Sequence, residues 1–249
     1  MVILKLPEEI EKARASSQIV AEVLSKMRDK VKPGVSTKEL DRFAEDIARK
    51  RGAKPAFKGY RGYPYSLCTS INEEVVHGMP SERILKEGDI ISLDFGVCYN
   101  GYFGDAAITL PVGKITTSAQ KLIEVTEQSL YAGIEQAKKG NRLGDISSSV
   151  QQIVEVPGFS VVRDFVGHGI GRNLHEDPQI PNYGKKGRGI ELKRGMILAI
   201  EPMVNQGTYK VKIMQDGWTV VTEDGMLSAH FEHSVAITEN GPDILSKLI

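Results

Sequence analysis

The chain has 249 residues, and its 32 basic and 32 acidic side chains leave a formal net charge of zero. This balance argues against nucleic-acid or membrane-surface binding driven by bulk charge. Two cysteines, Cys68 and Cys98, are too few for a disulfide framework and are compatible with a reducing compartment. No signal peptide is expected, and no segment has the roughly eighteen uncharged apolar residues of a membrane-spanning helix, so we expect a cytoplasmic protein.

The first half of the chain is expected to contain two helices followed by strands. Apolar residues recur at helical spacing over 8–30, and Pro33-Gly34 ends that helix. Ser36 with Glu39 three residues later is typical of a capping box, which predicts a second helix over 36–51. Strands are expected at 67–76, 89–98 and 102–110.

The second half is expected to repeat this order of elements. Helices are predicted at 118–139 and 143–154, and strands near 160–165, 196–204, 210–214, 218–222 and 227–238. No low-complexity linker interrupts the sequence. A single catalytic domain over 1–249 is therefore expected, with internal halves at about 8–112 and 113–240.

Two strand segments, about a hundred residues apart, resemble each other without a gap. The segment 85–97, LKEGDIISLDFGV, aligns with 192–204, LKRGMILAIEPMV, so Asp94 corresponds to Glu201. A rougher match lies downstream between 105–109, DAAIT, and 232–238, EHSVAIT, which begin with Asp105 and Glu232. A long period present only twice indicates two halves related by a pseudo-twofold axis, the alternative being chance likeness of two amphipathic strands. Four acids on related strands indicate a metal site.

The dipeptide Asn100-Gly101 lies between strand residues and is a strong signal for a two-residue hairpin turn. Asp94 and Asp105 would then be diagonal neighbours on one face of the ribbon. Apolar residues surround them, so we expect buried acids, which need a metal ion, a proton or a base; a solvated acidic face is the alternative. The turn predicts three facing pairs: Tyr99 with Tyr102, Gly96 with Asp105, and Asp94 with Ala107.

The five histidines fall in three places: a glycine-rich loop with His168 and His175, the end of an apolar strand with His77, and the last long strand with His230 and His233. Strand alternation puts His230 on the same face as Glu232 and His233 on the opposite face. Taken singly, each is more often a satisfied polar residue than a ligand. The absence of H-E-x-x-H and C-x-x-C patterns argues against zincin and zinc-finger sites.

An ordered set of short motifs runs through the chain: Val76-His77-Gly78, Leu93-Asp94, Gly104-Asp105, Gly167-His168-Gly169-Ile170-Gly171, His175-Glu176, Ile200-Glu201-Pro202 and Phe231-Glu232-His233. This set resembles the type I methionine aminopeptidases of the short bacterial kind. The resemblance spans about 10–237 and implies an α/β pita-bread fold, in which two pseudo-twofold-related halves form an antiparallel sheet covered by helices.

The resemblance implies a metal-dependent enzyme that removes the initiator methionine from nascent proteins, preferably before a small second residue. It places two divalent ions, Co, Mn, Fe or Zn, on five ligands: Asp94, Asp105, His168, Glu201 and Glu232. Asp105 and Glu232 would bridge the ions, Asp94 would complete the ligands of one, and His168 with Glu201 those of the other. Carboxylates with one imidazole suit these metals without selecting sharply among them, and two such ions can activate a bridging water.

The resemblance also implies which side chains contact substrate. His77 and His175 would contact the peptide and stabilise the tetrahedral intermediate, and Glu201 would carry a proton from water to the leaving amine. Four residues match family positions around the methionine side chain: Tyr60, Tyr63, Cys68 and Trp218. Phe57 and Leu174 stand where some relatives place a smaller and a larger residue respectively. Ordinary core packing is the alternative for the aromatic side chains.

Other implications concern partners and competing functions. Relatives often bind a monovalent Na or K ion through backbone carbonyls near Asn72, Glu74 and Ser228, and the family suggests a monomer whose task is compatible with transient ribosome contact. One alternative is a hydrolase of X-Pro peptides or a creatinase-like enzyme, although those relatives usually carry a large extra amino-terminal domain. The other is a non-catalytic binding protein on the same fold, although such relatives have lost metal ligands.

Overall fold

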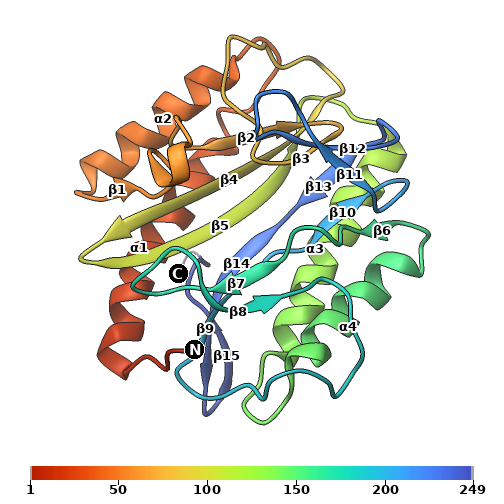
Figure 1. The fold of residues 1–249 in the computed structure, drawn as a ribbon. Helices are drawn as coiled ribbons and strands as arrows, with labels where there is room; N and C mark the ends of the chain where they lie inside the picture. The colour runs from red at the N-terminus through yellow and green to blue at the C-terminus, as the bar shows by residue number, and fades with distance from the viewer. Residues whose placement is uncertain (1, 248–249) are drawn as a thin grey trace.

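The computed structural model describes residues 2–247, in which two pairs of helices pack against a large sheet (Figure 1). The chain is α/β, as the sequence predicts. Over the described residues, no helix is both long enough and apolar enough to cross a membrane. In chain order the elements are α1 (Pro7–Met27), α2 (Thr37–Lys50), β1 (Lys54–Pro55), the 3-10 helix η1 (Tyr60–Gly62), β2 (Cys68–Ile71), β3 (Glu74–Val76), β4 (Ile90–Tyr99), β5 (Tyr102–Pro111), α3 (Thr117–Gln136), α4 (Leu143–Glu155), β6 (Ser160–Val161), β7 (Gly167–Gly169), β8 (Glu176–Ile180), β9 (Ile197–Ile200), β10 (Met203–Asn205), β11 (Val211–Ile213), β12 (Val220–Thr222), β13 (Ser228–His230), β14 (Glu232–Thr238) and β15 (Gly241–Ile244).

The largest sheet joins the two parts of the chain. Its strand order is β1-β4-β5-β14-β9-β7-β8, with β2 paired to β4 and β15 paired to β14. The antiparallel pair of β5 with β14 is the junction, where Glu232 faces Ala107 and His233 faces Ala106. The two mutually similar sequence segments contribute β4 and β9, which lie one strand away from that junction on either side. Figure 1 shows α1 and α2 toward one end of this sheet and α3 and α4 toward the other.

The β4–β5 hairpin has the register that its turn predicts. Asn100 and Gly101 have φ values of 50° and 77°, the left-handed conformation that a tight type I′ turn requires. A Cβ at Gly96 would lie 3.1 Å from Asp105 Oδ1, so glycine leaves the space that this acid occupies. Three Cα pairs confirm the predicted register: Tyr99 with Tyr102, Gly96 with Asp105, and Asp94 with Ala107.

Four of the predicted strands are wrong in their extent. The segment 67–76 is divided into β2 and β3 at Asn72, whose φ is 57° and whose side chain accepts a hydrogen bond from the Ile90 N–H at 3.0 Å. The segment 196–204 is interrupted at Pro202, which has no N–H to donate. The segment 227–238 is interrupted at Phe231, and the strand near 160–165 covers only β6. Four further strands, β1, β7, β8 and β15, were not predicted from the sequence.

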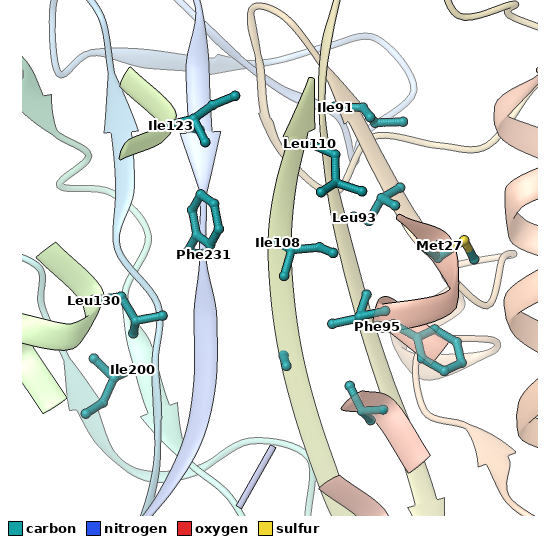
Figure 2. Close-up of a cluster of buried hydrophobic side chains, with 14 of the residues drawn as sticks. Met27, Ile91, Leu93, Phe95, Ile108, Leu110, Ile123, Leu130, Ile200 and Phe231 are labelled. Atoms are coloured by element: carbon teal, nitrogen blue, oxygen red, sulfur yellow. The ribbon is translucent and has the colours of Figure 1, made fainter. Parts of the chain in front are cut away.

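The main core lies between the helices and the sheet, and Figure 2 shows part of it. Phe95 and Leu93 of β4 are fully buried and lie near Met27 of α1, while Ile200 and Leu130 belong to the same cluster farther along the sheet. Burying a side chain of this size stabilises the fold by roughly 1.5–3 kcal/mol. The strands that carry the candidate ligands are therefore held in a rigid frame.

Glu9 ties the first turn of α1 to two other parts of the chain. Its Oε1 accepts hydrogen bonds from the Tyr102 hydroxyl at 2.6 Å and from Arg172 Nη2 at 2.8 Å, and its Oε2 accepts one from the Leu6 N–H at 2.9 Å. These hydrogen bonds lower the pKa of Glu9 to about 2; the bond from the Tyr102 hydroxyl has the largest effect, followed by those from Leu6 and Arg172. Ionised Glu9 therefore connects α1, β5 and the segment after β7.

Replacing Glu9 by Gln is expected to lower the free energy of unfolding at neutral pH by about 1 kcal/mol, a value reduced for solvent screening of exposed partners. The folded-state pKa lies below the ordinary value of 4.5, so this contribution is present above pH 4.5 and is lost as pH falls through about 2. Urea unfolding in chelator at several pH values measures it. The Glu8→Gln variant is the control, and a wild-type advantage that stayed constant down to pH 2 would contradict the assignment.

Candidate metal centre and substrate pocket

Four carboxylates and one imidazole, each from a different strand or strand end, line one cavity of about 140 Å³. One water needs only roughly 10–15 Å³, so the space is large enough for a ligand. Asp105, His168 and Glu232 each offer a ligand atom, and these three atoms lie within 4.8 Å of one another. Glu201 adds Oε1 at 3.6 Å from His168 Nε2, and Asp94 completes the wall. The five residues singled out as ligands are thus in one place.

Burial dominates the electrostatics of these groups. It raises the pKa of Asp94 to about 7. The pKa of Asp105 is raised well above its ordinary value by burial first and then by repulsion from Glu232 and Asp94, and burial followed by the neighbouring acids has the same effect on Glu201 and Glu232. Burial lowers the pKa of His168 to about 4, so its ring keeps a free lone pair at neutral pH. The crowded acids favour a bound cation.

The chemistry of the cluster fits divalent metal ions. Within residues 2–247, Asp94 Oδ1, Asp105 Oδ1 and Glu232 Oε1 are buried and have no hydrogen-bond partner. Buried acceptors without partners are unfavourable, and a metal ion supplies the missing interaction. Four ionised carboxylates would also balance the charge of two divalent ions. Oxygen ligands with one imidazole match Mn, Fe, Co and Zn.

His77 enters the cavity from the end of β3. Its backbone has a φ of 60°, an uncommon left-handed conformation that turns the chain directly after Val76. The following residue must be glycine, because a Cβ at Gly78 would lie 2.3 Å from the carbonyl oxygen of Thr69. The His77 ring packs edge to face with Phe165 at a centroid distance of 5.7 Å, and burial lowers its pKa to about 4. It is thus a neutral side chain at neutral pH.

His175 reaches the same cavity from the start of the β8 hairpin. Its ring stacks on Tyr60 with centroids 5.3 Å apart, and its Nδ1 is hydrogen-bonded to the Tyr60 hydroxyl at 3.0 Å. The His168 ring lies 4.2 Å away, centroid to centroid. A buried ion pair fixes the next residue, since Lys5 Nζ donates to Glu176 Oε2 at 2.5 Å. The amino-terminal segment therefore helps to hold His175 in place.

Aromatic side chains close the rest of the cavity. The Tyr63 hydroxyl donates to the carbonyl oxygen of Gly78 at 3.0 Å, and the Trp218 ring meets the Tyr63 ring edge to face at 5.2 Å. Asp216 fixes the turn before Trp218 by accepting its N–H at 2.8 Å. Phe57, Tyr60 and Cys68 also line the space. Leu174 is not one of its lining residues; it is buried in the adjacent apolar cluster with Phe57 and Cys68.

Three residues near the site were not singled out as functional by sequence. Arg61 lines the cavity, has a φ of 49° and places its guanidinium 5.4 Å from the centre of the Tyr60 ring. Lys5 acts through its pairing with Glu176, which no local pattern reveals. His230 is 1% exposed and its Nε2 lies 3.7 Å from Glu201 Oε2. The alternation argument assumed one continuous strand, whereas β13 ends at His230 and β14 begins at Glu232.

Comparison with known proteins gives matches over nearly the whole chain. The sequence model described as metallopeptidase family M24 matches residues 11–239. A methionine aminopeptidase of Clostridium perfringens is 57% identical over 246 residues, covering 99% of each chain, and methionine aminopeptidase 1 of Bacillus subtilis is 55% identical over 248 residues, covering 100% of each. The crystal structure of methionine aminopeptidase from Thermotoga maritima superposes with a TM-score of 0.98 at 50% identity, covering 99% of this chain and 100% of that one.

Proposed function

This chain belongs to metallopeptidase family M24, and from that premise we propose that it removes the amino-terminal methionine from nascent proteins by metal-dependent hydrolysis. Its fold is the pita-bread fold of those relatives. The observation that carries the proposal is the buried acid cluster, with its unpartnered oxygens, at the bottom of an aromatic cavity. The two halves, about 8–112 and 113–240, supply this site jointly in our proposal, because Asp105 and Glu232 come from the two strands at the junction.

We assign two divalent ions to Asp94, Asp105, His168, Glu201 and Glu232. Asp105 and Glu232 would serve both ions, a role supported by their place on the two paired strands β5 and β14. His168 and Glu201 would hold one ion together, supported by their 3.6 Å approach, and Asp94 would help to hold the other. When bound, the ions polarise the scissile carbonyl and lower the pKa of a water. Co, Mn, Fe and Zn are all compatible with this ligand set.

The protein side chains carry the remaining steps. Glu201 takes a proton from the attacking water and delivers it to the leaving amine, since its carboxylate lies at the wall of the cavity beside His168. His175 donates a hydrogen bond to the developing oxyanion, and His77 holds the peptide in register. Both rings are neutral at neutral pH because burial lowers the pKa of His175 to about 3 and of His77 to about 4.

The substrate methionine side chain enters the part of the cavity with aromatic and thiol walls. Phe57, Tyr60, Tyr63, Cys68 and Trp218 offer it an apolar and polarisable surface, which suits a thioether. Cys68 is buried and burial raises the pKa of its thiol, so it remains a neutral wall residue. Leu174 supports this wall from the apolar cluster behind it. We also propose that the preferred substrates have a small second residue.

Tyr60→Phe is expected to lower kcat by about fivefold and to leave KM for Met-Ala-Ser nearly unchanged. The substitution keeps the ring that stacks on His175 and removes only the hydroxyl, 3.0 Å from its Nδ1, that fixes the proton on Nε2. One hydrogen bond contributes about 1 kcal/mol, hence the estimate. Steady-state kinetics measure both parameters. Tyr65→Phe is the control, and a change confined to KM would show that Tyr60 acts on binding alone.

The proposed function also implies a cellular location, an oligomeric state and a partner. We propose a cytoplasmic monomer that meets its substrate at the amino terminus of the nascent chain and contacts the ribosome transiently. We also propose a monovalent Na or K ion at backbone carbonyls near Asn72, Glu74 and Ser228. Asn72 and Ser228 adjoin in the fold, since the Ser228 N–H donates to the Asn72 carbonyl at 2.8 Å.

Hydrolysis of defined peptides tests the substrate assignment. Protein stripped with chelator and reloaded with Mn or Co is given Met-Ala-Ser, Met-Leu-Ser and an Ala-Pro peptide. Release of methionine from the first, much less from the second and no cleavage of the third would support the proposal. Preferred cleavage of the Ala-Pro peptide would favour an X-Pro hydrolase, and no cleavage with any metal would favour a non-catalytic binding protein.

A further inference from the structure

We propose that His230 is a positioning residue for Glu201: its Nε2–H donates to the carboxylate oxygen that does not face His168. This inference rests on the proposed function of Glu201. His230 is the last residue of β13 and is 1% exposed. Among the residues that the structure describes, its Nε2 is a buried polar atom without a hydrogen-bond partner, and it lies 3.7 Å from Glu201 Oε2. Glu201 Oε2 is therefore the acceptor that a proton on His230 Nε2 would have.

The geometry of Glu201 supports different roles for its two carboxylate oxygens. Oε1 lies 3.6 Å from His168 Nε2, and Oε2 lies 3.7 Å from His230 Nε2. The carboxylate is therefore flanked by two imidazoles, each facing one oxygen. If His168 and Oε1 serve the same ion, Oε2 keeps lone pairs that the ion does not use. His230 is placed to occupy one of them.

The backbone of His230 is fixed on a separate network. Its N–H donates to Thr109 Oγ1 at 2.9 Å, and Thr109 Oγ1 donates to its carbonyl oxygen at 2.8 Å. Thr109 Oγ1 also lies 2.8 Å from Ser92 Oγ, which joins β5 to β4. These hydrogen bonds fix the backbone position from which the His230 side chain extends. Because the backbone of His230 is fixed, a hydrogen bond from its ring restricts the orientation of the Glu201 carboxylate. Glu201 itself lies directly after β9, at the break before Pro202.

Orientation of a ligating carboxylate by a neighbouring hydrogen bond affects both metal binding and catalysis. Loss of such a partner typically reduces metal affinity or activity by about 10–100-fold. A residue that merely fills space would instead affect the stability of the fold. His233 provides the contrast, since it lies three residues away on the opposite face, where its Nδ1 is hydrogen-bonded to Ser246 Oγ at 2.8 Å.

The test compares His230→Leu, His230→Gln and His233→Leu with wild type. Mn²⁺ affinity is measured by titration of stripped protein, kcat and KM with Met-Ala-Ser, and stability by urea unfolding without metal. We expect His230→Leu to weaken Mn²⁺ binding and to lower kcat, each by about 10–100-fold, with little change in KM. His230→Gln, which keeps an N–H donor, should stay within about threefold of wild type, and His233→Leu should keep the wild-type Mn²⁺ affinity.

Two results would overturn the inference: His230→Leu with the Mn²⁺ affinity of wild type, or His230→Gln and His230→Leu impaired equally. The ¹⁵N spectrum of the Zn-loaded protein gives an independent check, because the proposal requires a proton on His230 Nε2. An unprotonated Nε2 would leave no donor facing Glu201 Oε2 and would also overturn the inference. If wild type failed to release methionine, the proposed function would fall, whereas the Mn²⁺ affinities and the ¹⁵N spectrum would still decide the role of His230.

Discussion

Asp105→Asn is expected to reduce methionine release from Met-Ala-Ser at least about 10³-fold at saturating Mn, equivalent to about 4 kcal/mol of transition-state stabilisation. Asparagine has nearly the shape of aspartate but offers one neutral oxygen and an NH₂ donor in place of two anionic oxygens. Asp105 is 3% exposed, and its Oδ1 has no hydrogen-bond partner within residues 2–247. We therefore expect no water or neighbouring side chain to replace its carboxylate as a ligand. The substitution removes a negative charge where we place both ions.

The same variant distinguishes a functional loss from a folding defect. Burial and repulsion from Glu232 and Asp94 raise the pKa of Asp105, so the metal-free protein gains nothing from this charge. Metal-free Asp105→Asn should therefore unfold in urea no earlier than metal-free wild type. Asp46→Asn, an exposed acid on α2, is the matched control and should keep full activity. More than a tenth of wild-type activity in Asp105→Asn would remove this residue from the ligand set.

The second large effect concerns stability. Returning Mn to stripped protein at a hundred times its dissociation constant should raise the free energy of unfolding by about 2.7 kcal/mol for each site, because the ion binds the folded state. For a chain of this length that corresponds to a rise in Tm of roughly 5–10 °C. The gain should be absent in Asp105→Asn combined with Glu232→Gln, which removes both acids at the junction of β5 with β14. Thermal scans with and without Mn measure it.

A change in Tm of equal size in wild type and the double variant would show that Mn stabilises the protein elsewhere. Mg at the same ionic strength is the control for unspecific effects, because it dehydrates reluctantly and demands near-ideal octahedral geometry. Equal stabilisation by Mg and Mn would therefore argue against the proposed ligand set, which contains an imidazole.

Local patterns predicted the first acid pair well. The dipeptide Asn100-Gly101 specifies a turn with two left-handed residues, and the turn in turn fixes every facing pair of β4 and β5. The approach of Glu232 to Asp105 could not follow from such a pattern. It depends on the pairing of β5 with β14 across more than a hundred residues, which only the internal repeat and the family resemblance indicated.

The features of the fold and site that were not predicted from the sequence depend on contacts between residues far apart in the chain. The strand β7 carries His168 in a glycine-rich segment that has no strand pattern, and it forms because β8 and β9 pair with it on either side. The breaks at Asn72 and Phe231 divide segments that were predicted as continuous strands. Lys5 meets Glu176 across 171 positions of the chain. None of these pairings leaves a local sequence signal.

The measurement that tests the metal centre most directly is a count of the ions that the chain binds. Stripped wild type and the Asp105→Asn, Glu232→Gln double variant are dialysed against Mn, and the bound metal is determined by elemental analysis. We predict two ions per chain in wild type, with strong loss in the double variant and a parallel loss of methionine release. Equal binding by the two proteins, or none by wild type that still releases methionine, would contradict a metal centre at the junction of β5 and β14.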